Sequence, residues 1–256
     1  MSNDIRNSIE FKVWGRYALF TDPLTRVGGE KCSYHVPTYE SLKGVVKSIY
    51  WKPTLIWVID EIRVMKRIRT QTKGTKPLNF VGIYPSAQDT SKKQEPPNTL
   101  AIYTFLADVE YQVRAHFEWN RARPELAKDR NEHKHHNIAK RMLERGGRQD
   151  IFLGTRDCQG YVEPCQFGSG TGHYDGAGEL AFGLMFHGFD YSDEIGDGKL
   201  HARFWRQTMV DGVVRFNRPE NCSLRKFVRT MSVKSFAEGK NLRGVEDEGA
   251  ELEGMS

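Results

Sequence analysis

Three histidines and a lysine lie within four consecutive positions, in the stretch Asn131-Glu132-His133-Lys134-His135-His136. An imidazole gains or loses a proton near neutral pH, so these side chains suit general acid–base chemistry. A lysine at the same place can stabilise negative charge that develops on a phosphate. The residue types therefore fit metal-free RNA cleavage, in which a base takes the 2′-OH proton and an acid protonates the 5′-oxygen that leaves.

Two other interpretations of this stretch compete with RNA cleavage. A zinc site normally uses separated ligand pairs with thiolate or carboxylate help, and the neighbouring cations raise the cost of binding a dication. The four cysteines, Cys32, Cys158, Cys165 and Cys222, form no C-x-x-C pair and are expected to be reduced thiols. We therefore predict no metal and no cofactor. The third interpretation, a solvated polar loop at a helix start, is the one that the residues alone favour.

The histidine stretch lies inside a basic segment, 121–148, which holds nine basic and four acidic residues. A second basic run, 63–76, holds six basic residues and no acidic one. Such cations can contact the phosphates of a nucleic acid, although a solvated strand face explains the second run equally well. Gly146-Gly147-Arg148 closes the first segment. A glycine turn of this kind either lets backbone N–H groups approach phosphates or ends a helix.

The composition of the whole chain restricts the class of protein. Its 256 residues are 38% hydrophobic and 28% charged, which is typical of a soluble globular protein. The 14 Phe, 10 Tyr and 5 Trp residues exclude disorder of the whole chain. The longest apolar run, 55–59, is too short to span a membrane. No secretory signal is evident at the start, so we expect a cytoplasmic protein without membrane contact.

Charge is distributed unevenly along the chain. The last nineteen residues, 238–256, hold six acidic and two basic residues, a net charge of −4. The whole chain carries +5, so the residues before this tail carry +9. A basic body suggests a polyanionic partner. The acidic, glycine-rich tail is expected to be disordered.

Hydrophobic periodicity predicts the elements that position these side chains. Strands are expected at 9–20, 54–66, 99–119 and 150–167, and helices at about 38–50 and 136–145. Residues 109–119 alternate so regularly that one face of that strand should be buried and the other wet. The resulting order, βαββαβ, is the split βαβ arrangement of a ferredoxin-like domain.

The predicted fold class is therefore α+β, a ferredoxin-like (RRM-like) domain followed by a small antiparallel β-sheet subdomain. The first domain is expected at 1–172, with an inserted loop at 67–97. Short strands and turns, including a hairpin across Asp211-Gly212, place the second at 173–235. The acidic tail follows at 236–256.

Motifs spread from about residue 9 to about residue 232 resemble the subtype I-C member of the fifth family of CRISPR-associated (Cas) proteins, within the RAMP superfamily. The motifs are Ala18-Leu19-Phe20-Thr21-Asp22-Pro23, Gly28-Gly29-Glu30-Lys31, Pro37-Thr38-Tyr39, Ser48-Ile49-Tyr50-Trp51-Lys52-Pro53, Asp129-Arg130-Asn131-Glu132, Gly146-Gly147-Arg148, Asp150-Ile151-Phe152-Leu153-Gly154 and Gly160-Tyr161-Val162-Glu163-Pro164-Cys165. Their joint order over that span is specific, although no single motif is decisive.

The resemblance implies a RAMP fold and a metal-independent endoribonuclease that cuts precursor CRISPR RNA at its repeat hairpins. The family's catalytic tyrosine, lysine and histidine fall on Tyr50, Lys134 and His135. His135 would transfer the proton, Lys134 would stabilise charge and Tyr50 would orient the 2′-OH. The products would be a 2′,3′-cyclic phosphate and a 5′-OH. His133 and His136 flank the motif, so the assignment among the three histidines stays open.

The residues expected to bind RNA are Arg63, Lys66, Arg67, Arg130, His133, His136, Arg141, Gly146, Gly147 and Arg148. The partners implied are the repeat hairpin, the mature guide RNA and the other subunits of a type I-C Cascade complex. The alternative function is a non-catalytic scaffold that binds the 5′ handle of the guide RNA. A metal-dependent DNA nuclease is a third and weaker hypothesis, suggested by the histidine cluster.

Overall fold

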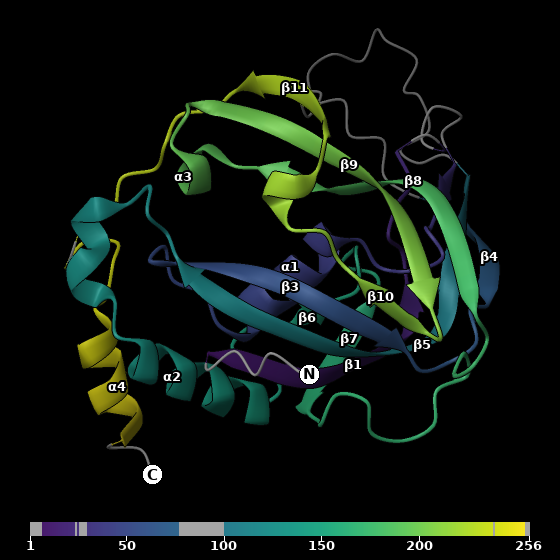
Figure 1. The fold of residues 1–256 in the computed structure, drawn as a ribbon, viewed down its shortest axis with the longest axis horizontal. Coiled ribbons are helices and arrows are strands. Elements are labelled where there is room, and N and C mark those ends of the chain that lie inside the picture. Colours follow the sequence, from purple (N-terminus) through teal and green to yellow (C-terminus); the bar gives the residue numbers. More distant parts are fainter. Residues whose placement is uncertain (1–6, 24, 26–29, 77–99, 238, 254–256) are drawn as a thin grey trace, which may run out of the picture.

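The computed structural model describes residues 7–23, 25, 30–76, 100–237 and 239–253. Most of the inserted loop predicted at 67–97 lies outside these residues. The described part is an α+β fold in which a large, mostly antiparallel sheet is accompanied by few helices (Figure 1). Within these ranges no helix is both long and apolar enough to cross a membrane.

Four strands form the centre of the sheet, in the order β3-β5-β1-β7. They are β1 (Ser8–Ala18), β3 (Leu55–Val64), β5 (Ala101–Trp119) and β7 (Gln159–Pro164). Each strand runs antiparallel to its neighbours, so that Val13 of β1 lies between Tyr111 of β5 and Val162 of β7. All three side chains are buried in the core. The alternation predicted for these segments therefore does place apolar side chains on a buried face.

Helix α1 (Tyr39–Ile49) packs against β3 with the apolar face that the sequence predicts. Leu42, Val46 and Ile49 are buried in the core. The Thr38 hydroxyl accepts a hydrogen bond from the backbone N–H of Ser41, which satisfies one donor at the free end of the helix. The helix ends where Tyr50 becomes extended, as expected before a Lys-Pro pair.

Helix α2 (Glu132–Glu144) begins four residues earlier than predicted. The side chain of Asn131 accepts a hydrogen bond from the backbone N–H of Lys134 and so caps the helix start. The prediction of a start at residue 136 was wrong because it relied on apolar periodicity, and the first helical turn here is polar. The histidine cluster consequently lies on a helix and not in a loop. Helix positions hold side chains more rigidly than a solvated loop does.

The remaining strands extend the sheet beyond its centre. They are β2 (Lys31–Cys32), β4 (Thr70–Thr75), β6 (Ile151–Phe152), β8 (Glu179–Asp190), β9 (Lys199–Val210), β10 (Val213–Arg215) and β11 (Leu224–Thr230). Short helices lie at η2 (Pro124–Asp129), α3 (Ser192–Ile195) and η3 (Pro219–Asn221). β10 pairs with β3, so the C-terminal strands continue the central sheet.

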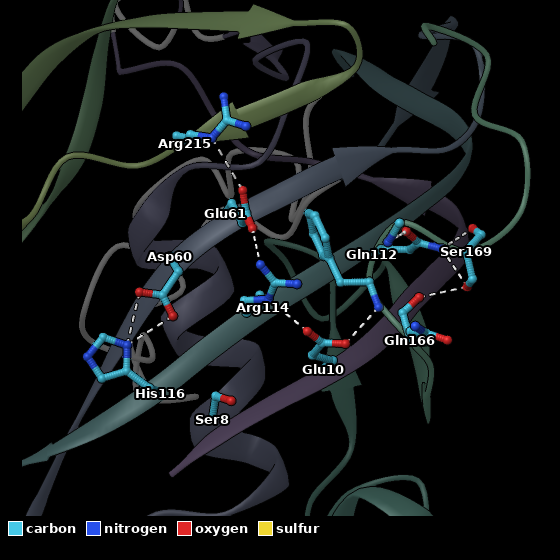
Figure 2. A network of polar contacts seen from close by, with 12 residues as sticks. Ser8, Glu10, Asp60, Glu61, Gln112, Arg114, His116, Gln166, Ser169 and Arg215 are labelled. Atoms are coloured by element: carbon cyan, nitrogen blue, oxygen red, sulfur yellow. Dashed lines mark hydrogen bonds and ion pairs between the residues drawn. The ribbon is translucent and has the colours of Figure 1, made fainter. Parts of the chain in front are cut away.

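The polar face of β5 is covered, and the expectation that it would be wet was wrong for two residues. Gln112 and His116 are both buried. The Gln112 amide donates to the Ser169 carbonyl oxygen at 2.7 Å, and the His116 imidazole contacts Asp60 at 2.9 Å (Figure 2). The loop after β7 lies on this face, because the backbone N–H groups of Phe167 and Gly168 bond to side chains of β1 and β5. Strand periodicity cannot reveal such a cover, which comes from a distant segment.

Ion pairs connect β1, β3 and β5 on the same face of the sheet. Arg114 of β5 donates to Glu10 of β1 at 2.7 Å and to Glu61 of β3 at 2.5 Å (Figure 2). Each strand thus contributes a half-buried charge that a neighbouring strand compensates.

The acidic tail is also ordered over part of its length, contrary to the expectation of disorder. Residues Val245–Glu253 form helix α4, which lies beside α2 (Figure 1). The sequence argument considered only the repulsion among the tail's own carboxylates. It left out the cations of the folded body, which bind these carboxylates and are described below.

Candidate active site

Tyr50 and His135 meet where the end of α1 approaches the start of α2. The Tyr50 hydroxyl lies 2.8 Å from Nδ1 of His135, although the two residues are 85 positions apart in the chain. Both residues are 0% exposed. The aromatic rings of Phe117 and Trp119 contact the His135 ring edge-on. The sequence predicted both residues, and the fold brings them into direct contact.

The second nitrogen of His135 determines the tautomer of the ring. Nε2 lies 2.7 Å from the backbone carbonyl oxygen of Asp129. A carbonyl oxygen only accepts, so Nε2 carries the proton and Nδ1 accepts the hydrogen bond that Tyr50 donates.

Burial sets the protonation state of this pair. It lowers the pKa of His135, an effect that the Asp129 hydrogen bond and charge oppose only in part. Burial also raises the pKa of Tyr50, and the nearby carboxylates of Glu248 and Asp129 raise it further. At neutral pH the pair is therefore an uncharged imidazole beside an intact phenol. An uncharged imidazole is a competent general base once the lone pair at Nδ1 can reach the reacting proton.

Asp129 connects three segments around the histidine. One carboxylate oxygen accepts from the Thr54 hydroxyl at 2.5 Å, and the other accepts from the backbone N–H of Val245 at 2.6 Å. Its carbonyl oxygen holds His135, as described above. Asp129 therefore positions the histidine. Sequence reasoning assigned it no role, although it begins the matching motif Asp129-Arg130-Asn131-Glu132.

Three cations surround the pair, and each forms an ion pair with helix α4. Lys134 pairs with Glu246, and Lys52 pairs with Glu248. Arg148 reaches the other carboxylate oxygen of Glu248 at 2.5 Å. Sequence reasoning missed Lys52, although it stands two residues after Tyr50 in the motif Ser48–Pro53.

Other residues of the histidine stretch have different surroundings. Nε2 of His136 lies 2.8 Å from the carbonyl oxygen of Ser8, and burial lowers the pKa of His136. His133 is exposed on α2, and Arg141 is half-buried further along that helix. Arg130 donates to the backbone carbonyls of Asn120 and Arg123 and so holds the chain before η2.

The glycine turn closes α2 and does not form a phosphate cradle. Gly146 and Gly147 have φ of 84° and 107°, a region that favours glycine. Their backbone N–H groups bond to the carbonyls of Leu143 and Met142 at 3.0 and 2.8 Å. These N–H groups are therefore engaged by the helix end, and the expectation that they bind RNA has no support in this geometry.

The second basic run lies far from the histidine. Arg63 stands near the end of β3 that is opposite Thr54, and a ten-residue strand is about 33 Å long. Its buried guanidinium bonds to Asp175, Gln112 and the carbonyl oxygens at 169 and 170. Arg63 therefore anchors the loop after β7, and we do not retain it as an RNA contact. Lys66 pairs with Asp108 at 2.8 Å, and Arg67 is exposed.

The part of the chain that the structure describes contains no group of three or more His, Cys, Asp or Glu side chains that could hold a metal ion. The groups present at the α1–α2 junction are an imidazole, a phenol and an ammonium ion. They are the groups that proton transfer and charge stabilisation at a phosphate require.

Comparison with known proteins identifies the family of this chain. Residues 8–217 match the family described as CRISPR-associated protein (Cas_Cas5). A protein of Mannheimia succiniciproducens named CRISPR pre-crRNA endoribonuclease Cas5d is 32% identical over 152 residues, 55% of this chain and 64% of that protein. A protein of the same name from Thermus thermophilus is 28% identical over 159 residues, 61% and 63% of the two chains. The chain thus spans less than two thirds of the length of these relatives.

Two solved structures resemble most of the fold. A crystal structure of a CRISPR-associated protein is 30% identical, with a TM-score of 0.67, over 86% of this chain and 96% of that one. A functionally uncharacterized protein from Streptococcus mutans is 32% identical, with a TM-score of 0.66 and the same coverage. With a family match over most of its length and these relatives, the chain belongs to the fifth family of CRISPR-associated proteins, in its I-C (Cas5d) subtype.

Proposed function

We propose that this protein is an endoribonuclease that cuts the repeat hairpins of precursor CRISPR RNA. The contact between the Tyr50 hydroxyl and Nδ1 of His135, with Lys134 on the same helix, carries the proposal. The two relatives named as pre-crRNA endoribonucleases support it. The strand order β3-β5-β1-β7, with α1 and α2 as its helices, supports a ferredoxin-like core for the catalytic domain.

The uncharged His135 is the proton-transfer group. The ribose 2′-OH approaches Nδ1, which takes its proton while the 2′-oxygen attacks the adjacent phosphorus. The bond from phosphorus to the 5′-oxygen breaks, and that oxygen takes a proton from solvent water as it leaves. The products are a 2′,3′-cyclic phosphate and a 5′-OH. No metal ion is required for this transfer.

Lys134 and Tyr50 support that step in different ways. The Lys134 side chain is 39% exposed, so its charge is accessible to a phosphate bound at the surface. Its ammonium stabilises the charge that accumulates on the phosphate oxygens. Without RNA, the Tyr50 hydroxyl donates to Nδ1 and so holds the imidazole in position. When RNA binds, the 2′-OH replaces this hydroxyl at Nδ1, and Tyr50 orients the 2′-OH.

The product RNA stays bound, and the protein acts in the cytoplasm within a type I-C Cascade complex. Cations that remain on the surface, including Arg67, supply phosphate contacts. Such contacts make binding weaker as salt rises, because each one releases counterions from the RNA.

A cleavage assay tests the function and the histidine assignment together. Repeat RNA from the same CRISPR locus, labelled at its 5′ end, is incubated in EDTA with the wild-type protein. Matched reactions use His133→Ala, His135→Ala and His136→Ala. We expect one cut by the wild type and its loss in His135→Ala with binding retained. Loss in another histidine variant instead would move the proton-transfer role to that residue.

A second function is favoured by one observation, the complete burial of Tyr50 and His135. A subunit that only binds the 5′ handle of the guide RNA needs no accessible histidine. Tight binding of the repeat RNA without any cut by the wild-type protein would establish this scaffold function in place of the nuclease. Cleavage of DNA on addition of Mg²⁺ or Mn²⁺ would point to the metal-dependent alternative.

A further inference from the structure

Helix α4 lies over the site that the proposed function needs to open. The backbone N–H of Val245, at the start of α4, bonds to Asp129, which also holds His135. Val245 itself is buried in the core. A reacting ribose must touch Nδ1 of His135, yet His135 has no exposed surface. The described structure is therefore a closed state with respect to RNA cleavage.

Two carboxylates of α4 lie against cations of the folded body. Glu248 lies between Lys52 and Arg148, and its side chain and that of Lys52 are each 8% exposed. Glu246 pairs with Lys134 and also accepts from the Asn131 side chain at 3.0 Å. Lysine and arginine converging on one acceptor group suit a phosphate as well as a carboxylate.

The neighbouring surface has room for a nucleotide. A hollow of about 440 Å³ is lined by Trp51, Lys52 and Arg148 on one side and by residues 236 and 241–243 of the tail on the other. Trp51 is 41% exposed, and an exposed indole offers a face on which a base can stack. Movement of the tail would widen this hollow and increase the exposed fraction of the Lys52 side chain.

We propose that Lys52 and Arg148 form a phosphate-binding site beside the Tyr50–His135 pair, and that α4 fills this site with Glu248 until RNA displaces it. The proposal rests on the proposed function, because it takes RNA as the ligand. Lys52 becomes an RNA-binding residue. The acidic tail becomes an internal competitor that keeps the free protein from engaging unrelated RNA.

The attachment of α4 suits reversible release. A helix of nine residues is too short to be stable alone, so α4 depends on the contacts it makes. Those contacts are the buried Val245 with its bond to Asp129 and ion pairs with Lys52, Lys134 and Arg148, of which the exposed Lys134 pair is the one that salt weakens most. An RNA phosphate at Lys52 and Arg148 would restore the charge balance that Glu248 provides.

A pair of charge-matched variants tests the proposal. Glu246→Gln/Glu248→Gln removes two charges that face the site. Asp247→Asn/Glu251→Gln removes two charges from the same helix, at exposed residues, and Glu251 pairs with Arg243 of the tail. Both doubles change the net charge equally, so a general electrostatic effect on RNA binding is the same in each. Thermal unfolding verifies that each variant is folded.

The readout is the dissociation constant of fluorescein-labelled repeat RNA, measured in EDTA in a His135→Ala background so that no cleavage occurs. We expect the Glu246/Glu248 double to bind about tenfold more tightly than its parent, the factor for a closed state that holds roughly nine-tenths of the molecules. The control double should change by less than about twofold. Equal changes in both doubles, or none in either, would overturn the proposal.

Hydrogen exchange gives a second measure that does not depend on the variants folding well. Amides of residues 245–253 in the wild-type protein should exchange faster when repeat RNA is added, because α4 leaves its site. Unchanged or slower exchange on saturation with RNA would contradict displacement.

The contribution of Lys52 is tested in the Glu246/Glu248 double, where its ion pair with the tail is already absent. Lys52→Gln should weaken RNA binding and reduce the slope of log affinity against log salt by about one. Lys12→Gln removes the same charge from β1, where Lys12 pairs with Glu163, and serves as the control. Equal effects of the two lysine variants would remove Lys52 from the site.

These binding measurements remain informative if the nuclease hypothesis fails. A protein that binds repeat RNA and never cuts it can still show displacement of α4, and the scaffold function then applies. Conversely, cleavage by wild-type protein without any effect of α4 would keep the nuclease and reject the competitor.

Discussion

Two buried histidines lie in contrasting parts of the molecule. His135 lies at the junction of α1 and α2 and is bonded to a phenol and a backbone carbonyl. His116 lies on the polar face of the sheet, 5% exposed, and contacts both carboxylate oxygens of Asp60 at 2.9 Å (Figure 2). Glu118 lies 3.5 Å from its other nitrogen.

Burial acts on both histidines in the same direction, but their partners differ in charge. Burial lowers the pKa of His135, whose two hydrogen-bond partners are uncharged, and the Asp129 carboxylate 3.6 Å from Nε2 opposes that effect only in part. Burial also lowers the pKa of His116, but the hydrogen bonds and charges of Asp60 and Glu118 outweigh it and the net shift is upward. The shift therefore favours the uncharged form of His135, whereas it favours the protonated form of His116, which connects β5 to β3 through Asp60. The charge of the hydrogen-bond partner, and not depth in the fold, separates the proposed catalytic histidine from the histidine that connects the strands.

The largest expected difference between the two histidines is in the rate of RNA cleavage. His135→Ala should lower the rate of repeat-RNA cleavage by about 10²- to 10⁴-fold, the range for loss of a general acid–base group. His116→Ala, which removes the same side chain from the other region, should change the rate less than about tenfold at a temperature where the variant is folded. Single-turnover cleavage in EDTA measures both. Similar losses in the two variants would show that the two histidines are not functionally distinct.

A smaller effect is expected on stability when the neutral partner of His135 is removed. Tyr50→Phe deletes the hydroxyl that donates to Nδ1 and leaves a buried acceptor without its bond. We expect the free energy of unfolding to fall by about 2 kcal/mol. Urea unfolding measures the change, with Tyr161→Phe, on the exposed surface of β7, as the control. A loss no larger than that of the control would mean that the Tyr50–His135 bond does not stabilise the fold.

The charged partner of His116 should contribute in a pH-dependent way. A raised pKa in the folded state stabilises the protein fully below the unfolded value of about 6.5, and the contribution is lost as pH rises through the folded value. Asp60→Asn should therefore cost about 1 kcal/mol at pH 6 and less at pH 9. Urea unfolding at the two pH values gives the difference. An equal cost at both would contradict a protonated His116.

The smallest effect is the order in which the two imidazoles titrate. His135 has a lowered pKa, so it should take up its proton only below pH about 6.5, and its contribution to stability should be lost as pH falls. His116 should still be protonated above that pH. NMR of the ring protons, assigned with the two alanine variants, follows each titration. The reverse order would invalidate the distinction on which the mechanism rests.

Local patterns along the chain were sufficient for the regular elements. The spacing of Leu42, Val46 and Ile49 predicted α1, and the alternation of apolar and polar residues predicted β5. Each pattern depends only on residues a few positions apart in the chain. The start of α2 was misplaced because its cap, Asn131, precedes a turn without apolar side chains.

The family motifs located Tyr50, Lys134 and His135, but not how they are arranged. The hydrogen bond between Tyr50 and His135 depends on how α1 and α2 pack on the sheet, and 85 residues separate the two in the chain. Asp129 and Lys52 lie within the family motifs, but the motifs do not indicate which groups they contact. Only the structure shows that Asp129 accepts from Val245 and that Lys52 pairs with Glu248.

The acidic tail shows most clearly the difference between what the sequence determines and what the tertiary structure determines. Its composition predicts self-repulsion and disorder, and that reasoning holds for a chain surrounded by water. In the folded protein Lys52, Lys134 and Arg148 are gathered from three separate segments and offer α4 a set of opposite charges. Periodicity and residue chemistry depend on neighbouring positions in the chain, so the sequence alone is enough to determine them. Pairing between distant polar groups exists only after packing has brought them together, since the energy of a charge depends on what surrounds it.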